Sequence, residues 1–313
     1  MSLPIYALDD DGRKHMTGLA LLWSNLLAAS GYLYGKGPGF AAARVGQGLR
    51  LLLSLPQHFS VLRVLSHPQC SGLLRRYPML AFKYLGDYVA LGLPVAARRS
   101  IFVSHFRSLQ RLFNANFLDL VQRSSPSLWY ATIDKRTFQI TLEMIGVLGC
   151  EGELRLVFYM DRSEVYRLIF VFASGRDFDL PDEKLLIVTG IQGVRDFERV
   201  KIATKTCCDI QPAHILMTAI GAIAEASRVS TILGPHETRQ LFCGAQLLFS
   251  YGDFFHNYGK EIPGQNMYRI DVPFYRKPTL AIKATHRRRN RRKRQFRTDV
   301  HQRVFEAIRQ YLE

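Results

Sequence analysis

Three stretches of the sequence hold residue types that could bind a charged group or transfer a proton. The first, LLIVTGIQGVRD, runs from Leu185 to Asp196 and passes from an apolar run into a glycine-containing turn before a helical segment. Backbone N–H groups at such a turn, together with the helix dipole, attract anions. We therefore expect Gln192, Gly193 and Arg195 to contact the phosphates of CoA or of another acyl or aminoacyl donor. The alternative is a tight turn that needs glycine and binds nothing.

The second stretch supplies side chains that could move protons. His236 and Glu237 follow the expected end of a strand, in GPHETRQLF, and could provide a general base. Asp253 lies further on in SYGDFFHNYG, whose aromatic residues could line an acyl pocket. We predict that His236, Glu237 and Asp253 form a catalytic set. The alternative is that these polar residues only cap helices and loops.

The third stretch is strongly basic. From residue 287 to residue 294, seven of eight side chains are cationic, so they must be solvated or paired with an anion. A polybasic segment gains about 1 kcal/mol per residue near an anionic membrane surface. We expect it to bind an anionic lipid, a lipopolysaccharide precursor or the inner-membrane surface; nucleic acid, including tRNA, is the alternative. The cationic residues are Arg287, Arg288, Arg289, Arg291, Arg292, Lys293 and Arg294.

The whole chain is basic as well. Its 313 residues carry 42 Lys and Arg against 26 Asp and Glu, a formal net charge of +16, and 48% of them are hydrophobic. This is the composition of a globular protein with anionic partners. The five cysteines lack zinc-ligand spacing, so we expect reduced thiols and no metal site. The apolar stretch 18–29 is expected to be a helix too short to span a bilayer. A cytoplasmic location follows, with peripheral attachment to the inner membrane left open.

Hydrophobic periodicity divides the chain into three parts. Residues 1–125 have the spacing of helices, most clearly from Arg98 to Ser124, which we interpret as one long helix. Residues 126–283 are expected to form a domain with a sheet. Residues 284–313 hold the basic run, followed by a C-terminal helix with one apolar face, TDVHQRVFEAIRQYL.

The central part alternates with a period of two. SLWYATID, FQITLEMI, ELRLVFYMD and VYRLIFVFAS read as successive antiparallel strands, with a hairpin at Asp161–Glu164. KLLIVTGIQG indicates a central strand buried on both faces. Two helices and a short strand, STILG, follow, and beyond Leu241 we expect irregular chain. The order predicts an α+β fold with a mixed, mostly antiparallel sheet. By analogy, it resembles the GNAT-type N-acetyltransferases, in which a strand–turn–helix element binds the donor.

Several motifs, taken in order, resemble those of the VirK/YbjX family of Gram-negative bacterial proteins, a domain of unknown function. The resemblance implies a role in the bacterial envelope and in virulence, without an agreed reaction. Two positions depart from the family pattern: Phe255 stands where tryptophan is usual, and Asn257 where an acidic residue is common. If these positions do chemistry in the family, this chain lacks it. The motifs are HP at 67–68, HF at 105–106, GIQG at 190–193, QPAHILMTAIGAIAEASRVSTILG, YGDFFHNYG and VPFYRKP.

These observations leave three functions open. The first is a GNAT-like acyl- or aminoacyl-transferase that acts on an anionic or membrane-associated acceptor. The second is a non-enzymatic, membrane-peripheral adaptor that uses its basic surface. The third is a nucleic-acid-binding protein, for which the chain shows no recognised binding motif. The sequence does not indicate the oligomeric state.

Overall fold

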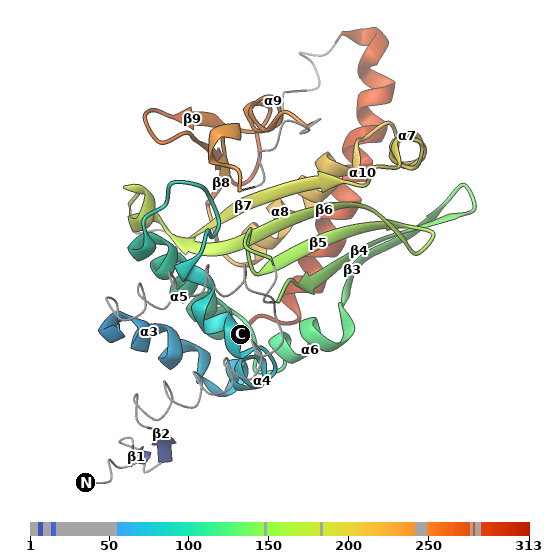
Figure 1. The fold of residues 1–313 in the computed structure, drawn as a ribbon. Coiled ribbons are helices and arrows are strands. Elements are labelled where there is room, and N and C mark those ends of the chain that lie inside the picture. Colours follow the sequence, from blue (N-terminus) through green and yellow to red (C-terminus); the bar gives the residue numbers. More distant parts are fainter. Residues whose placement is uncertain are drawn as a thin grey trace.

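An eight-stranded sheet and the helices around it form the main body of the protein (Figure 1). The apolar stretch 18–29, expected to be a helix, lies outside the described residues. The helical segments come first in the chain and the sheet follows, which confirms the expected α+β class. The computed structural model describes residues 6–8, 14–16, 55–146, 149–181, 184–241, 249–275, 278 and 283–313.

The sheet is mostly antiparallel. Its strand order is β3-β4-β5-β6-β7-β8-β10-β9, and of these neighbours β7 and β8 alone run parallel. The four antiparallel strands and the central strand expected from the sequence are all present. The strands are β3 (Ser127–Ile133), β4 (Arg136–Met144), β5 (Leu154–Met160), β6 (Ser163–Ser174), β7 (Lys184–Gly193), β8 (Thr231–Pro235), β9 (Lys260–Ile262) and β10 (Met267–Asp271), with β1 (Tyr6–Leu8) and β2 (Lys14–Met16) forming a separate antiparallel pair.

Two tight turns shape the first hairpins. Asp134–Lys135 and Asp161–Arg162 each have φ values of 49° and 63°. Positive φ at both central residues is the geometry of a type I′ turn, whose twist matches that of the flanking strands. Asp161 also accepts the N–H of Thr137 at 2.9 Å, which ties the second hairpin to the first. The hairpin expected at Asp161–Glu164 is thereby confirmed.

Helices cover the sheet and gather at one of its ends. α8 and α10 lie against the sheet, while α3, α4 and α5 form a group at the lower end in Figure 1. The helices are α3 (Leu55–Leu65), α4 (Pro68–Arg76), α5 (Val95–Leu112), α6 (Phe117–Ser124), α7 (Phe197–Thr206), α8 (Pro212–Ala226), α9 (Tyr251–His256) and α10 (Ala284–Arg309), together with the 3₁₀ turns η1 (Pro78–Leu85), η2 (Gly175–Phe178) and η3 (Glu237–Arg239).

The interpretation of residues 98–124 as one helix is wrong, because α5 ends at Leu112 and α6 begins at Phe117. The side chain of Asn114 accepts the N–H of Asn116 at 3.2 Å, a local bond that competes with helical hydrogen bonding. The break also lets the ring of Phe113 stack on that of Phe117, with centroids 3.9 Å apart. The apolar spacing continues through the break because α5 and α6 each bury one apolar face.

The break between α5 and α6 is where the C-terminal residues attach. The N–H of Asn114 donates to the C=O of Tyr311 at 2.8 Å, and the N–H of Glu313 donates to the C=O of Leu112 at 3.1 Å. These are backbone bonds that a continuous helix would not offer, since helical N–H and C=O groups bond within the helix. The chain therefore leaves the helix here to bind a segment far away in the sequence.

The expectation of irregular chain beyond Leu241 is wrong for β9 and β10. β10 pairs antiparallel with β8, with Met267 opposite Pro235 and Asp271 opposite Thr231. The two strands have only 3 and 5 residues, which is too short for the period of two to stand out. They complete the sheet on the far side of β8.

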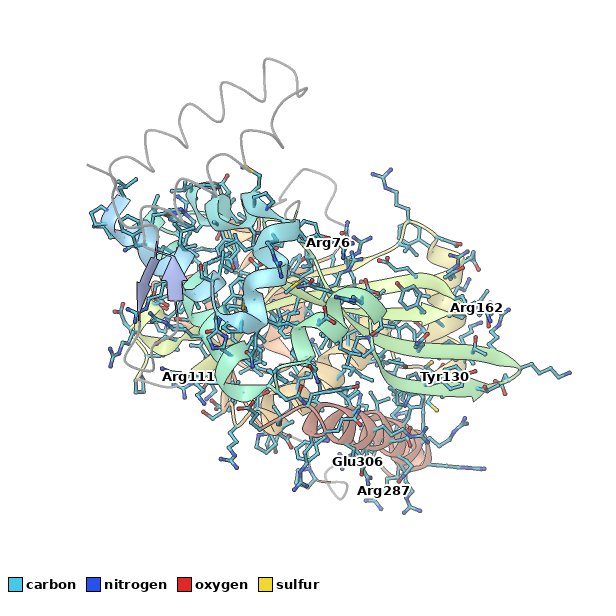
Figure 2. All side chains as sticks on the ribbon, turned by 90° about the horizontal axis from the view of Figure 1, so that it is seen from below. Arg76, Arg111, Tyr130, Arg162, Arg287 and Glu306 are labelled. Carbon is cyan, nitrogen blue, oxygen red and sulfur yellow. The ribbon has the colours of Figure 1, made fainter. Side chains whose placement is uncertain are left out.

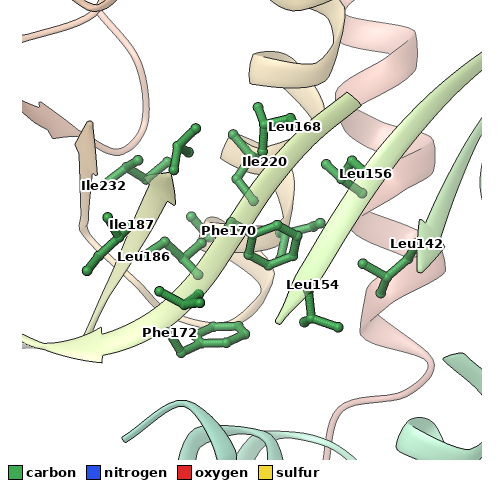
Figure 3. Packing of buried hydrophobic residues seen from close by; sticks show 14 of the residues in the cluster. Leu142, Leu154, Leu156, Leu168, Phe170, Phe172, Leu186, Ile187, Ile220 and Ile232 are labelled. Carbon is green, nitrogen blue, oxygen red and sulfur yellow. The ribbon is translucent and has the colours of Figure 1, made fainter. Parts of the chain in front are cut away.

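The core lies between the sheet and α8. α8 is apolar on nearly all sides, as a helix enclosed by other elements requires. Its Ile220 lies beside Leu168 and Phe170 of β6 (Figure 3). α10 covers α8 in turn with Val300, Val304 and Ile308, three of the apolar residues expected on the C-terminal helix, and all three are fully buried.

Two buried histidines, His105 and His58, make the free energy of unfolding depend on pH, because burial lowers their pKa values. His105 of α5 is fully buried and accepts the N–H of Phe172 through Nδ1 at 3.1 Å. His58 of α3 lies 3.1 Å from the hydroxyl of Tyr84. Burial lowers the pKa of His105 to about 3, with a further contribution from Lys83, and burial lowers the pKa of His58 to about 4.

We expect the free energy of unfolding to fall as the pH drops from about 6.5 towards 4. In this window the unfolded chain protonates both histidines and the folded chain does not, so each removes up to about 1.4 kcal/mol per pH unit. His105→Asn keeps an acceptor for the strand N–H and should reduce the slope by about one proton. The exposed His67→Asn is the control. Urea unfolding between about pH 7.5 and 5 gives the slopes, and an unchanged slope in His105→Asn would contradict the assignment.

Candidate functional site

The parallel pair β7–β8 opens towards its carboxyl end. The two strands pair only over residues 185–187 and 231–233, whereas β7 continues to Gly193. Both strands end at the same edge of the sheet, which is the edge where ligands bind in sheets with parallel strands. We call the region between residues 188–193 of β7 and residues 234–235 of β8 the β7–β8 fork.

α9 packs into the fork with two aromatic side chains. The hydroxyl of Tyr251 accepts the N–H of Ile191 and donates to its C=O, both at 3.0 Å. The ring of Phe255 lies so close to Gly234 of β8 that a Cβ there would come within 2.6 Å of it. In the fork, the N–H and C=O groups of Ile191 are thus hydrogen bonded to a side chain and not to a neighbouring strand. A ligand can replace the side chain in these hydrogen bonds.

The two departures from the family pattern fall at positions with structural roles. Phe255 is fully buried, so an aromatic ring at this position fills the core. Asn257 is exposed and donates its side-chain amide to the C=O of Asp253 at 2.7 Å, at the end of α9. These contacts assign Phe255 to packing and Asn257 to the helix end.

A carboxylate that was not singled out in the sequence, Glu151, lies beside the fork. The β6–β7 register shifts between residues 169 and 170, opposite Gly190. A Cβ at Gly190 would come within 3.1 Å of a Glu151 carboxylate oxygen. Burial raises the pKa of Glu151, and Arg167 partly offsets this effect. Burial also raises the pKa of Tyr251, and the charge of Glu151 adds to that rise. A carboxyl group with a raised pKa is suited to accept a proton near neutral pH.

The loop that carries Glu151 is fixed by a buried lysine, Lys83 of η1. Its Nζ donates to the C=O groups of Gly146 and Gly152, at 3.1 and 2.7 Å, and pairs with Glu153 at 3.0 Å. The Lys83 and Glu153 side chains are only 4% and 1% exposed. One cation therefore joins both ends of the β4–β5 loop and holds Glu151 against β7.

The three residues expected to bind donor phosphates lie at the turn between β7 and α7. Gln192 and Arg195 are exposed, and Gly193 is half-buried. A Cβ at Gly193 would come within 2.4 Å of the Tyr166 ring, so this contact requires glycine. Asp196 caps α7 by accepting a backbone N–H of its first turn at 3.0 Å. An anion at this turn would share the helix end with a carboxylate, and Arg195 is the cation that could offset that charge.

The predicted catalytic set lies near the start of α9. His236 Nε2 is 3.2 Å from a carboxylate oxygen of Glu237. Glu237 accepts the N–H of Gly252 at 2.6 Å and the hydroxyl of Ser250 at 3.2 Å. Burial by itself raises the pKa of Glu237, but these hydrogen bonds and the nearby histidine outweigh it and lower the pKa. Glu237 is thus suited to cap α9. Asp253, in the first turn of that helix, is exposed.

The basic run was expected to precede the C-terminal helix, but it forms the first part of that helix, α10. Arg287 lies on the outer side of α10 (Figure 2). Arginine and lysine are good helix formers, and an anion relieves part of their repulsion. Arg289 pairs with Asp209 at 3.1 Å, and Lys293 donates to the C=O of Asp209 at 2.7 Å. These two cations therefore face the end of α7. The exposed cations of the run include Arg287, Arg288, Arg291 and Arg292.

A small cavity of about 380 Å³ lies between α7 and α10. Lys205 of α7 and Arg288, Arg289 and Arg292 of α10 line it. Spacings of three and four residues place these arginines on one side of the helix. Cations from two helices thus converge on a volume that suits a phosphate group. The run is therefore helical, with part of it lining a cavity, and is not an extended basic tail.

Other expected features can be placed among the described residues. The four cysteines that the structure describes are free thiols. Cys207 follows the last residue of α7; burial raises its pKa to about 12, with Cys208 adding to the rise. In the described ranges, no three His, Cys, Asp or Glu side chains are grouped so that they could hold a metal ion. None of the described helices combines the length and the apolar character needed to cross a bilayer.

The protein has an α+β fold, and its candidate site lies where the parallel strands β7 and β8 separate. The basic helix α10 is its second distinctive feature. Comparison with known families matches residues 42–306 to a family described as a protein of unknown function, DUF535. The chain belongs to this family, which is the VirK/YbjX family indicated by the motifs. No curated protein and no solved structure matches the chain.

Proposed function

We propose that this protein transfers an acyl or aminoacyl group from a phosphate-bearing donor to an anionic or membrane-associated acceptor. The observation that carries the proposal is the β7–β8 fork, in which Glu151 lies beside a strand that pairs with β6 on one edge but is not paired with β8 beyond Ile187 on the other. A donor arm with amide groups, such as that of CoA, can hydrogen bond along such a strand edge. The likeness to GNAT-type enzymes is an analogy of element order.

The proposed donor lies along β7 with its phosphates towards the turn before α7. Its amide groups take over the Ile191 backbone bonds that Tyr251 makes at 3.0 Å. Arg195 then faces the phosphates at the start of the helix, with Gln192 and Gly193 as the adjoining backbone. The donor carbonyl comes to lie near Gly190, where the Glu151 carboxylate is.

In the proposed reaction, Glu151 removes the proton from the amine or hydroxyl of the acceptor. The acceptor atom bonds to the donor carbonyl carbon, and the bond from that carbon to the donor sulfur or oxygen breaks. The proton that Glu151 has taken then passes to the leaving group, which restores the carboxylate. His236, Glu237 and Asp253 are our second candidates for proton transfer.

The basic part of α10 provides the proposed docking surface for the acceptor. The small cavity beside α7 gathers Lys205 with three arginines, and further arginines are exposed on the same helix. Such a surface attracts an anionic lipid head group, a lipopolysaccharide precursor or the phosphates of a tRNA donor. Peripheral attachment to an anionic membrane is part of this proposal.

A thermal-shift and calorimetric screen tests donor binding. We expect CoA, an acyl-CoA or an aminoacyl-tRNA to raise the melting temperature at both low and high salt. Arg195→Gln should weaken donor binding by about tenfold or more, because it removes a charge-assisted contact. Gly193→Ala should weaken it as well, since its Cβ would push the Tyr166 ring away. Arg162→Gln, at an exposed hairpin tip, is the control.

The adaptor is the second candidate, and the rigid display of arginines on α10 favours it. If every shift in the screen comes from anionic lipid or nucleic acid and disappears at high salt, the transferase proposal fails. Charge reversal of Arg288 and Arg292 would then abolish binding, while Arg195→Gln would have no effect. Binding to nucleic acid alone, falling steeply with salt, would favour the third function.

A further inference from the structure

A second cavity, of about 1150 Å³, lies at the carboxyl-terminal end of α9, between α8, α10 and β10. It is lined by His214 and Thr218 of α8, by Tyr258, and by Arg297 and His301 of α10. None of the fork residues, and none of the predicted catalytic set, lines it. Its volume suffices for an organic molecule of ordinary metabolite size.

The two acidic side chains among the described lining residues of this cavity each have a basic side chain beside them. Glu225 lies 3.1 Å from Nε2 of His301, and Asp271 lies 3.3 Å from Nε of Arg269. Both acids therefore have a basic partner within the cavity wall.

Two cations of the cavity, in contrast, have no acidic partner. Arg297 Nε is buried and has no hydrogen-bond partner, and within the part of the chain that the structure describes Arg297 forms no ion pair. Lys260 is exposed at the rim and likewise forms no ion pair with the described residues. Burying an unpaired guanidinium nitrogen is unfavourable, so Arg297 calls for an anion.

Neutral hydrogen-bonding groups stand beside Arg297. His214 Nδ1 lies 2.6 Å from the hydroxyl of Tyr258. Burial lowers the pKa of His214 to about 4, with Arg297 and Lys293 contributing, so the imidazole is uncharged at neutral pH. The pair adds polar contacts without adding charge. The ring of Phe274, packed against Gly221 of α8, supplies an apolar wall.

We propose that this cavity binds an organic phosphate monoester, with Arg297 holding the phosphate, Lys260 closing over it at the rim, and Phe274 contacting the organic part. Two unpaired cations match the two charges of a phosphate monoester, whereas a carboxylate or a sulfate ester would match only one. The inference does not depend on the fork, because the two sites share no residue.

Isothermal titration calorimetry with octyl phosphate tests the site at about pH 8, where the monoester is a dianion. Octyl sulfate, with the same chain and a single charge, is the matched ligand. We expect saturable binding of octyl phosphate, about tenfold or more tighter than that of octyl sulfate. Arg297→Gln should weaken it about tenfold or more, and Lys260→Gln should weaken it less.

Arg309→Gln is the matched variant, since this arginine is exposed on the same helix and lies outside the cavity. Circular dichroism and melting temperature show whether Arg297→Gln is folded. If it is not folded, the affinity of Lys260→Gln for octyl phosphate tests the proposal instead, because Lys260 is on the surface. Equal affinity for the two octyl esters overturns the proposal, and so does an unchanged affinity in Lys260→Gln or in folded Arg297→Gln.

A vesicle arm separates the two sources of a phosphate monoester. Dioleoyl phosphatidic acid carries the monoester in a lipid, whereas phosphatidylglycerol at equal surface charge carries a diester. Preference for phosphatidic acid that Arg297→Gln removes supports a lipid head group. Binding of octyl phosphate without that preference supports a soluble phosphate. If the protein binds neither octyl phosphate nor phosphatidic acid, the proposed site is overturned.

Discussion

Replacing Lys83 with methionine should lower the free energy of unfolding by about 3–5 kcal/mol. The substitution leaves the Glu153 carboxylate, 1% exposed, without its cation and removes the donor that bonds the C=O groups of Gly146 and Gly152. An uncompensated buried charge is far more costly than the absence of the whole pair. Lys83→Met/Glu153→Gln should therefore recover part of the loss. Equilibrium denaturation of the three proteins measures both effects.

Lys184→Met is the control for this experiment, because Lys184 is an exposed lysine at the start of β7. Its free energy of unfolding should stay within about 0.5 kcal/mol of the parent protein. A loss of less than about 1 kcal/mol in Lys83→Met would show that the pair does not fix the loop. The β4–β5 loop would then need another anchor.

Glu151→Gln should lower the rate of acyl or aminoacyl transfer by about 10²–10⁴-fold while leaving donor affinity unchanged. Glutamine keeps the shape of the side chain beside Gly190 but cannot accept a proton. In the parent protein the proposed transfer rate should fall on the acidic side as Glu151 becomes protonated, at a pH above the usual range of a glutamate, because burial raises the pKa of Glu151. That acidic limb should be missing in the variant.

Glu306→Gln is the matched control, since Glu306 is exposed on α10 and lies outside the fork (Figure 2). Donor affinity by calorimetry and transfer rate across pH are measured on both variants. An acidic limb that persists in Glu151→Gln would assign the base to another group, with His236 and Asp253 next to be tested. Donor binding lost together with activity would indicate that Glu151 only positions the donor.

The regular part of the fold could be predicted because each segment repeats its pattern over several residues. β4 and β5 have apolar side chains at every second position, 138–144 and 154–160, and β7 is apolar along most of its length, as a central strand must be. β9 and β10 were missed because 3 and 5 residues cannot establish a period. The break after Leu112 was missed because the apolar spacing continues through it.

The candidate site was less accessible to sequence reasoning. The turn at Gln192–Arg195 could be found because strand, glycine and helix follow each other directly. Glu151 could not, because its raised pKa depends on burial beside Gly190 and on the Lys83 anchor from another part of the chain. The basic run was assigned to anion binding from its charge, but the cavity that it forms with Lys205 depends on α7, which only the folded structure brings near.

The placement of α10 has a consequence for how the protein is made. This helix is translated after every strand of the sheet, yet its Asp299 accepts the indole N–H of Trp129 in β3 at 3.1 Å, and the segment after it pairs with Asn114. The surface of α8 and of β3 that α10 covers therefore stays open while the strands leave the ribosome. Contacts this distant in sequence slow folding and expose apolar surface meanwhile, so the nascent chain is a natural client for chaperones.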